Sequence, residues 1–241
     1  MKSFVLFALA SLFVIPAQAQ APAEPARPAE GAAPPVRRNA LKYTPPKSAA
    51  SGMRIDGDGA SRGSGEKLPS LYVLAPNHTA LTTREQPSLF WYQTGPAKTR
   101  FELTLTEPKN PKPLLKVGAA KAEQAGIHRI SLAKQKVTLK PGVAYKWTIA
   151  GVPDPANRSQ DVIASGSIQR IEPDAKLTAA LAEAKGLDRA AAYAENGVWY
   201  DALETLTNEI DAAPKDKELR TQRIALLEQA GLKDPAAGER K

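Results

Sequence analysis

The chain has 241 residues, a net charge of +8 at pH 7 and no cysteine. Without cysteine it can form no disulfide and carry no lipid on an N-terminal cysteine, so its hydrophobic core must hold the fold. The basic residues are scattered along the chain and do not gather on one element among stacking aromatics, which argues against a nucleic-acid partner.

The first nineteen residues have the pattern of a secretory signal peptide. Lys2 provides the positive start, residues 4–15 form an apolar run of twelve, and Ala17 and Ala19 are the small residues that signal peptidase recognises. A membrane anchor is the alternative, but a helix needs about 20 apolar residues to cross a bilayer. We therefore expect cleavage near Ala19, no membrane span in the mature chain, and a periplasmic or secreted protein.

Residues 20–67 differ from the rest of the chain in composition. They contain seven prolines, six glycines and ten alanines, and Tyr43 is their only aromatic residue. Such a segment buries too little apolar surface to offset the entropy of ordering. The composition predicts a disordered tail, with the folded part beginning at residue 68.

Residues 68–173 have the sequence pattern of a β-domain. Within 100–107, Phe101, Leu103 and Leu105 alternate with polar residues, as in a strand with one buried face. Further strands are predicted within 70–76, 87–93, 127–133, 137–151 and 161–173. Six to eight short strands with glycine and proline turns and no intervening helix favour an antiparallel immunoglobulin-like or fibronectin-like β-sandwich.

The aromatic residues of these strands have particular expected places. Tyr145 and Trp147 follow a Pro-Gly turn and share one face, and Tyr145 is placed as the corner tyrosine of an immunoglobulin-like domain. Trp91 and Tyr92 lie on opposite faces of a strand that is apolar on both sides. That strand is either central, with helices over one face, or it exposes an aromatic platform for a ligand.

Residues 174–232 change to a helical period. Asp174 and Asp216 are placed to cap the first and last of four predicted helices, at 175–185, 188–195, 198–213 and 217–230. The remaining residues, 233–241, are expected to be frayed.

Part of the helical region matches the pattern of a tetratricopeptide repeat. The matching residues are Ala190, Tyr193, Gly197, Trp199, Ala202, Leu206 and Pro214. The small residues let two antiparallel helices approach, and the aromatic side chains fill the space between them. One unit is visible, whereas about three are needed for independent stability. We therefore expect this unit to bury its apolar stripe on other parts of the chain.

Several stretches resemble a bacterial family of unknown function, numbered 928. They are LYVLAPNHTALTTREQPSLFWYQ, FELTLTE, GIHRISLA, KPGVAYKWTI, DVIASGSIQRIEP and DRAAAYAENGVWYDALETL followed by LLEQAGL, in that order. The resemblance covers roughly residues 68–232. It implies an exported β-module followed by a repeat-like helical end, and it implies no activity, substrate or catalytic residue.

Catalytic candidates are few. His78 and His128 are the only histidines and lack the short spacing of a zinc site, and no nucleophile motif is present. A hydrolase could still use two opposed carboxylates, and the available ones are Glu85, Glu102, Asp154 and Asp161. We expect no enzyme, no metal and no cofactor, and keep a periplasmic hydrolase as an alternative.

Binding is the expected function, with another envelope or secreted protein as the partner and an anionic polysaccharide or peptidoglycan as the alternative. The candidate binding surface is Tyr92, Arg100, Lys146, Gln169, Arg170 and Tyr200. Tyr200 is included because it lies off the apolar stripe of its helix. By the same logic, Trp199→Ala should cost roughly 3–5 kcal/mol of stability, and Tyr200→Ala almost none.

Overall fold

A computed structural model of the chain describes residues 40–47, 54–57, 68–119 and 124–240. The predicted signal peptide, residues 1–19, lies outside the described residues, and so does most of the predicted tail. None of the helices in the described part of the chain is long and apolar enough to cross a membrane.

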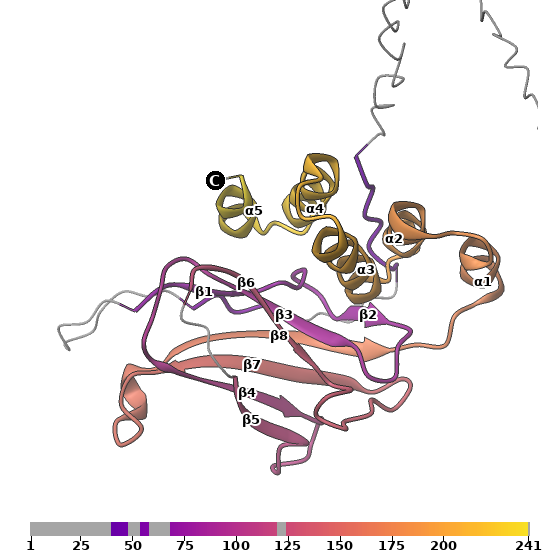
Figure 1. Cartoon of the computed structure of the whole chain (residues 1–241). Coiled ribbons are helices and arrows are strands. Elements are labelled where there is room, and N and C mark those ends of the chain that lie inside the picture. Colours follow the sequence, from indigo (N-terminus) through magenta and orange to yellow (C-terminus); the bar gives the residue numbers. More distant parts are fainter. Residues whose placement is uncertain (1–39, 48–53, 58–67, 120–123, 241) are drawn as a thin grey trace, which may run out of the picture. The chain divides into compact units, whose positions relative to one another are not determined.

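The described residues form a mixed α/β structure of two sheets and five α-helices (Figure 1). The strands are β1 (Leu71–Val73), β2 (Ala80–Thr82), β3 (Ser88–Gln93), β4 (Arg100–Thr106), β5 (Leu115–Ala119), β6 (Gly126–Ser131), β7 (Ala144–Val152) and β8 (Val162–Arg170). The helices are α1 (Ala175–Leu181), α2 (Gly186–Glu195), α3 (Trp199–Ala212), α4 (Lys217–Gln229) and α5 (Lys233–Glu239), and a 3-10 turn η1 (Arg158–Gln160) precedes β8.

One sheet has the strand order β1-β3-β6 and the other β2-β8-β7-β4-β5. All neighbours are antiparallel except β2, which pairs parallel with β8 through Ala80 and Ile168. The five-stranded sheet is therefore mixed, which corrects the expectation of a purely antiparallel arrangement. The short strands β2 and β5 were not predicted from the sequence.

The three-stranded sheet lies on the side of the five-stranded sheet that faces the helices (Figure 1), and α3 also packs against β2 of the larger sheet. The two sheets approach closely at Gly166 of β8, where an added Cβ would lie 3.1 Å from Val73 and 3.2 Å from Ala75. Strand β3 is the middle strand of the smaller sheet and is buried along its whole length. This agrees with a central strand and not with an exposed aromatic platform.

The turn before β7 contains the expected tyrosine contact. The backbone N–H of Lys140 donates to the Tyr145 hydroxyl at 3.1 Å, and Tyr145 is buried. Strand β7 begins only at Ala144, because Pro141 and Gly142 form the turn. The turn predicted at Pro141 and Gly142 is therefore present, and the strand with Tyr145 and Trp147 follows it.

Two stretches of the predicted tail are part of the folded unit. Residues 54–57 join the sheets: Ile55 pairs with Ser165 of β8, and Gly57 pairs with Leu71 of β1. Residues 40–47 lie against the helices and bury Leu41 and Tyr43. Composition averaged over 20–67 concealed these stretches, because a few apolar residues spaced two apart are enough to anchor an extended segment.

Helices α1 and α4 begin where the sequence places their caps, whereas α1 ends at Leu181 instead of 185 and α2 begins at Gly186 instead of 188. The Asp174 carboxylate accepts the Leu177 N–H at 2.7 Å, and Asp216 accepts the N–H groups of Glu218 and Leu219. The expectation of a frayed C-terminus was wrong, because residues 233–239 form helix α5 and bury Ala236.

Helix α3 packs against α2, the sheets and the residues before β3. The repeat-pattern residues Tyr193, Trp199 and Leu206 are all buried, as predicted. The Trp199 indole N–H donates to the backbone oxygen of Leu74 at 2.8 Å. Leu74 directly follows β1, so this hydrogen bond joins helix α3 to the β part of the protein.

Tyr200 contradicts the prediction of an exposed side chain. It is 0 % exposed, and its hydroxyl accepts the Trp147 indole N–H at 2.8 Å and donates to the Ser167 backbone oxygen at 3.1 Å. Burial raises the pKa of its hydroxyl. Helix α3 is covered on several sides, so a position outside the apolar stripe is still inside the protein.

Asp201 forms a third connection between α3 and the β part. Its carboxylate is fully buried and accepts from the backbone N–H of Thr83 at 2.8 Å and from Arg84 Nε at 3.0 Å. Burial raises the pKa of Asp201, and these contacts act in the opposite direction. The connection places α3 beside the start of β3, where the candidate site lies.

Candidate functional site

The predicted binding surface does not form one surface. Tyr92 and Tyr200 are buried, and Arg170 is bonded to Glu85 and Glu172. Arg100 and Lys146 lie at opposite ends of the β4–β7 ladder, six residues or about 20 Å apart.

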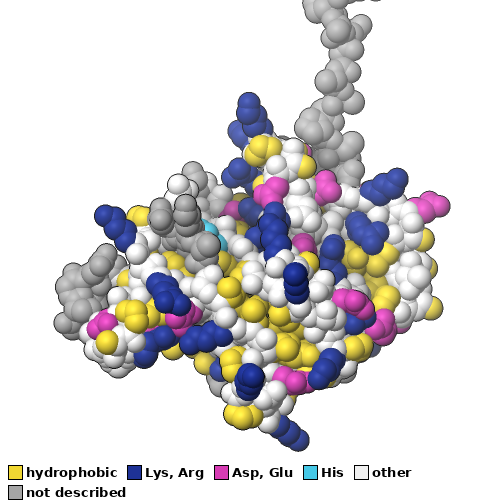
Figure 2. Space-filling view, turned by 60° about the horizontal axis from the view of Figure 1, so that its bottom comes forward, with side chains coloured by type: hydrophobic (Ala, Val, Ile, Leu, Met, Phe, Trp, Pro, Cys, Tyr) yellow, Lys and Arg dark blue, Asp and Glu magenta, His cyan; other side chains and the backbone are white. Residues whose placement is uncertain are grey.

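Lys146 and Gln169 are the two predicted residues that the structure does bring close. The β7–β8 register pairs Lys146 with Ser167, so Gln169 lies two residues along the same face. Basic side chains are spread over the face in Figure 2 and form no single patch there.

The two histidines have structural contacts. His78 contacts the Tyr43 hydroxyl through Nε2 and the Thr79 backbone oxygen through Nδ1, each at 3.1 Å. His128 stacks on Trp91 with ring centroids 5.3 Å apart, and burial lowers its pKa. No cluster of three metal-ligating side chains occurs among the described residues.

Two of the four candidate carboxylates meet at one arginine. Arg158 donates to Asp161 at 2.7 Å and to Glu102 at 3.0 Å, and Arg100 and Lys116 also approach Glu102. Burial alone would raise the pKa of Glu102, but these cations together hold it below its usual value. The arrangement is an ion-pair network on the outer face of the larger sheet.

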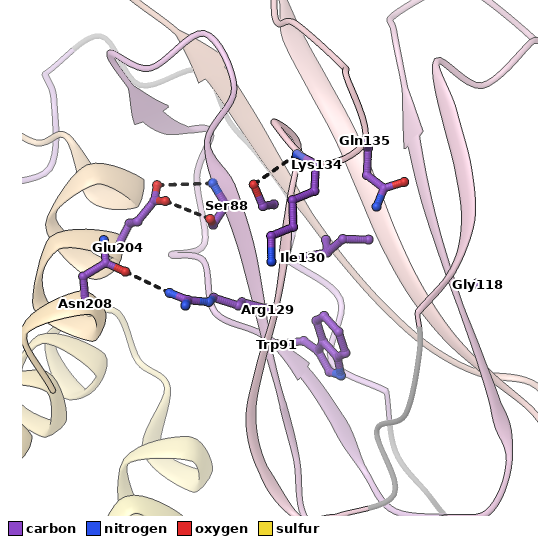
Figure 3. Close-up of a pocket in the computed structure, with 10 residues that line it drawn as sticks. Ser88, Trp91, Gly118, Arg129, Ile130, Lys134, Gln135, Glu204 and Asn208 are labelled. Carbon is purple, nitrogen blue, oxygen red and sulfur yellow. Dashed lines mark hydrogen bonds between the residues drawn. The ribbon is translucent and has the colours of Figure 1, made fainter. Parts of the chain in front are cut away.

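A pocket lies at the edge of strand β6, and we call it the β6-edge pocket (Figure 3). Its volume is about 460 Å³. It is lined by Ser88, Trp91, Gly118, Arg129, Ile130, Ser131, Lys134, Gln135, Glu204 and Asn208. Gly118 comes from the edge strand β5 of the other sheet, so the pocket opens between two sheet edges.

A serine and a glutamate in this pocket connect strand β3 to helix α3. The Glu204 carboxylate accepts the Ser88 hydroxyl at 2.8 Å and the Ser88 backbone N–H at 3.2 Å, and Arg84 lies 3.5 Å away. A serine nucleophile needs a base and an open path to substrate, but Ser88 is 4 % exposed. The pair therefore fixes the wall of the pocket.

The pocket presents two cations of different kinds. Arg129 is oriented by α3, because its guanidinium donates to Asn208 at 2.8 Å and pairs with Asp211 at 3.2 Å. The Lys134 side chain runs along the middle of the pocket (Figure 3) and forms no ion pair with any residue that the structure describes. Lys134 is exposed, so a carboxylate of a ligand in the pocket could reach its ammonium group.

Trp91 adds an unusual polar atom to the same pocket. The residue is 2 % exposed, and its buried indole N–H has no hydrogen-bond partner among the described residues. Buried N–H groups are nearly always paired. Because this nitrogen is itself buried, it is not a contact point for a ligand in the pocket.

Sequence reasoning missed this pocket. Ser88 and Glu204 are 116 positions apart, and no local motif links them. Lys134 and Gln135 lie in a turn whose next residue, Lys136, has a φ of 55°, which few residues other than glycine adopt. That turn is visible only in three dimensions, although the polar run AKQK after a strand would have been the place to look.

The fold and the pocket define the class of protein: a mixed α/β domain with helices packed against strands of both sheets and a polar pocket at a sheet edge. The chain belongs to the family described as Domain of Unknown Function (DUF928), which it matches over residues 57–239. The match confirms the resemblance found in the sequence. A comparison with curated proteins finds no match.

Proposed function

We propose that this protein is a non-catalytic, exported module of the cell envelope that binds an extended segment of another protein at the β6-edge pocket. The observation that carries the proposal is the position of the pocket beside a strand edge. Among the described residues, β6 pairs with β3 on one side only. An open edge offers backbone donors and acceptors to an incoming strand.

The lining of the pocket supports an acidic partner segment. Strand addition gives affinity through main-chain hydrogen bonds, and pockets for alternate side chains give specificity. Lys134 and the oriented Arg129 favour a carboxylate, while Ile130 and Trp91 provide apolar surface beside it. A peptide with an acidic residue next to an apolar one fits both features.

Two features of architecture belong to the same proposal. The facing sheets are read as a variant of a β-sandwich, with the parallel β2–β8 pair as its departure from the immunoglobulin-like pattern. Helices α2 and α3 are read as one tetratricopeptide-like unit, supported by the buried Tyr193, Trp199 and Ala202. Export rests on the signal-like pattern of residues 1–19.

Site-specific crosslinking tests the proposal. A photo-reactive residue is placed at Gln135 in the pocket or, as a control, at Ile163, which is 45 % exposed and lies on β8. In cells that make the protein, position 135 should give one reproducible protein adduct, and Lys134→Glu should abolish it. Identical adducts from both positions, or an adduct that survives Lys134→Glu, would refute the proposal.

A second candidate function has an observation of its own. Three cations, Arg100, Lys116 and Arg158, share the two carboxylates of Glu102 and Asp161, so this cluster on the larger sheet carries one surplus positive charge. This favours an anionic envelope polysaccharide or peptidoglycan as ligand. Retention on such a polymer should then fall with salt and with Lys116→Glu, and remain unchanged with Lys134→Glu.

A further inference from the structure

Residues 40–47, which we call the strap, cross the helical part of the protein as an extended segment. Figure 1 shows the strap running beside α3, between α2 and α4. Leu41 and Tyr43 are buried, whereas Lys42 between them is exposed. This alternation is that of a strand-like peptide with one face turned into a groove.

The main chain of the strap is bound by side chains of helix α4. Gln229 accepts the Tyr43 N–H at 2.8 Å and donates to the Leu41 oxygen at 2.5 Å. Gln222 accepts the Leu41 N–H at 2.7 Å. Two glutamine amides thus satisfy three successive main-chain groups on one side of the strap, as a neighbouring strand would.

Tyr43 contacts two other parts of the chain, helix α3 and the residues before β2. Its ring meets Trp199 edge-on, with centroids 5.1 Å apart, and its hydroxyl lies 3.1 Å from His78 Nε2. His78 Nδ1 lies 3.1 Å from the Thr79 carbonyl oxygen, which can only accept, so Nδ1 carries the hydrogen. In the neutral ring Nε2 is then an acceptor, and the Tyr43 hydroxyl donates to it.

Gly197 lies directly against the second half of the strap. It has a φ of 76°, and a Cβ there would lie 2.9 Å from the Thr44 oxygen and 3.0 Å from Pro46 Cδ. The Thr44 N–H donates to the Ala194 oxygen at 3.1 Å. The glycine of the repeat-like pattern is therefore needed for the passage of the strap as well as for the turn between helices.

We propose that the groove between α2, α3 and α4 is a peptide-binding site that the chain's own strap fills in cis. The ligand class is an extended peptide with an aliphatic residue and a tyrosine two positions apart, as in Leu41 and Tyr43. The glutamine side chains bind main-chain groups of the strap, and a separate peptide offers the same groups. This site goes beyond the proposed function, because it shares no residue with the β6-edge pocket.

Cis occupancy makes the site self-blocked. A segment tethered by a short connection has an effective concentration on the order of millimolar at its own site. A free peptide of the same sequence must compete with that concentration. The groove therefore accepts a partner only when the strap is displaced, or when the partner binds much more tightly than the strap.

The test uses the full chain carrying Leu41→Ser and Tyr43→Ser, which vacates the groove. A fluorescent peptide of sequence ALKYTPPK, residues 40–47, is titrated against this variant and against the unsubstituted chain, and its anisotropy is measured. The peptide should bind the variant, and its apparent affinity for the unsubstituted chain should be at least about 10-fold weaker because the strap competes.

Matched controls identify the contacts. A peptide with Lys42→Ala should bind the variant within about twofold, because Lys42 is exposed. A peptide with both Leu41→Ser and Tyr43→Ser should not bind. Adding Gln229→Ala to the variant chain should weaken binding about 10-fold, since two main-chain hydrogen bonds are lost.

A second measurement covers the case in which the variant does not fold. A protease site placed within residues 48–53 of the otherwise unsubstituted chain separates the strap from the body after cleavage. Native mass spectrometry should show the strap still bound, and added labelled ALKYTPPK should replace it. If the labelled peptide neither binds a folded variant nor exchanges into the cleaved chain, the strap is an integral part of the core and the proposal is overturned.

Discussion

At the residue scale, Tyr200 shows why the position of a side chain on a helix does not by itself decide its exposure. Its neighbour Trp199 was correctly placed in the interior from the apolar stripe of α3. Tyr200 lies outside that stripe, yet it is fully buried because the sheet residues Trp147 and Ser167 cover that side of the helix. The apolar stripe of a helix identifies one buried face, and it does not show whether a second face of the helix is also buried.

Tyr200→Phe is therefore expected to destabilise the protein, in contrast to the effect predicted from the sequence for loss of this side chain. The substitution leaves the buried Trp147 N–H without its acceptor, which costs about 1–3 kcal/mol. Chemical denaturation measures the change. Tyr72→Phe is the control, because that hydroxyl binds Asp234 at a more exposed site. A smaller loss for Tyr200→Phe than for Tyr72→Phe would contradict this account of the interior.

Glu102 gives a pH-dependent prediction. Its pKa is held below the ordinary 4.5, so its ion pairs stabilise the folded state above that pH and lose this effect as the pH falls through the lowered pKa. Glu102→Gln should cost about 1–2 kcal/mol at pH 7.

The stability difference between the two proteins should shrink steadily below pH 4.5, the ordinary pKa of this group. Thermal melts at several pH values check this, with the exposed Glu183→Gln as control. A difference that grows towards low pH would have the wrong sign.

At the element scale, the sequence predicted elements with a strong local signal and missed those held by distant contacts. The alternation in β4 and the caps at Asp174 and Asp216 were predicted because each depends on neighbouring residues. Strands β2 and β5 are too short to show a period. Helix α5 has a polar, proline-containing sequence, and its position depends on contacts with α4.

The ion pair between Arg223 of α4 and Glu239 of α5 should hold that last helix in place. Both side chains are about nine-tenths buried, and two nitrogens of the guanidinium contact the carboxylate. Glu239→Gln leaves a buried cation without its counter-charge and should cost about 3–5 kcal/mol.

Arg240 and Glu228 provide the matched control, because that pair is half exposed. Glu228→Gln should change the free energy of unfolding by about 1 kcal/mol or less. Equal effects of the two substitutions in urea denaturation would show that burial does not distinguish these pairs.

At the scale of the whole molecule, assembly of the two proposed binding surfaces could not be predicted. The β6-edge pocket combines residues of β3, β5, β6, α3 and a turn, and the strap groove joins residue 41 to residue 222. Composition placed residues 40–47 in a tail, yet they fill a groove between three helices. Both sites depend on contacts between residues that are far apart in the chain, so no short stretch of sequence contains them.

The central claim, that a partner adds an extended segment to β6, is tested most directly by amide hydrogen exchange. The partner recovered by crosslinking through Gln135 is added to the purified full chain, and exchange is followed with and without it. Within Gly126–Ser131, the amides that point away from β3 should become protected on binding, and Lys134→Glu should remove that protection. Unchanged exchange in β6, with protection at another surface, would contradict the claim.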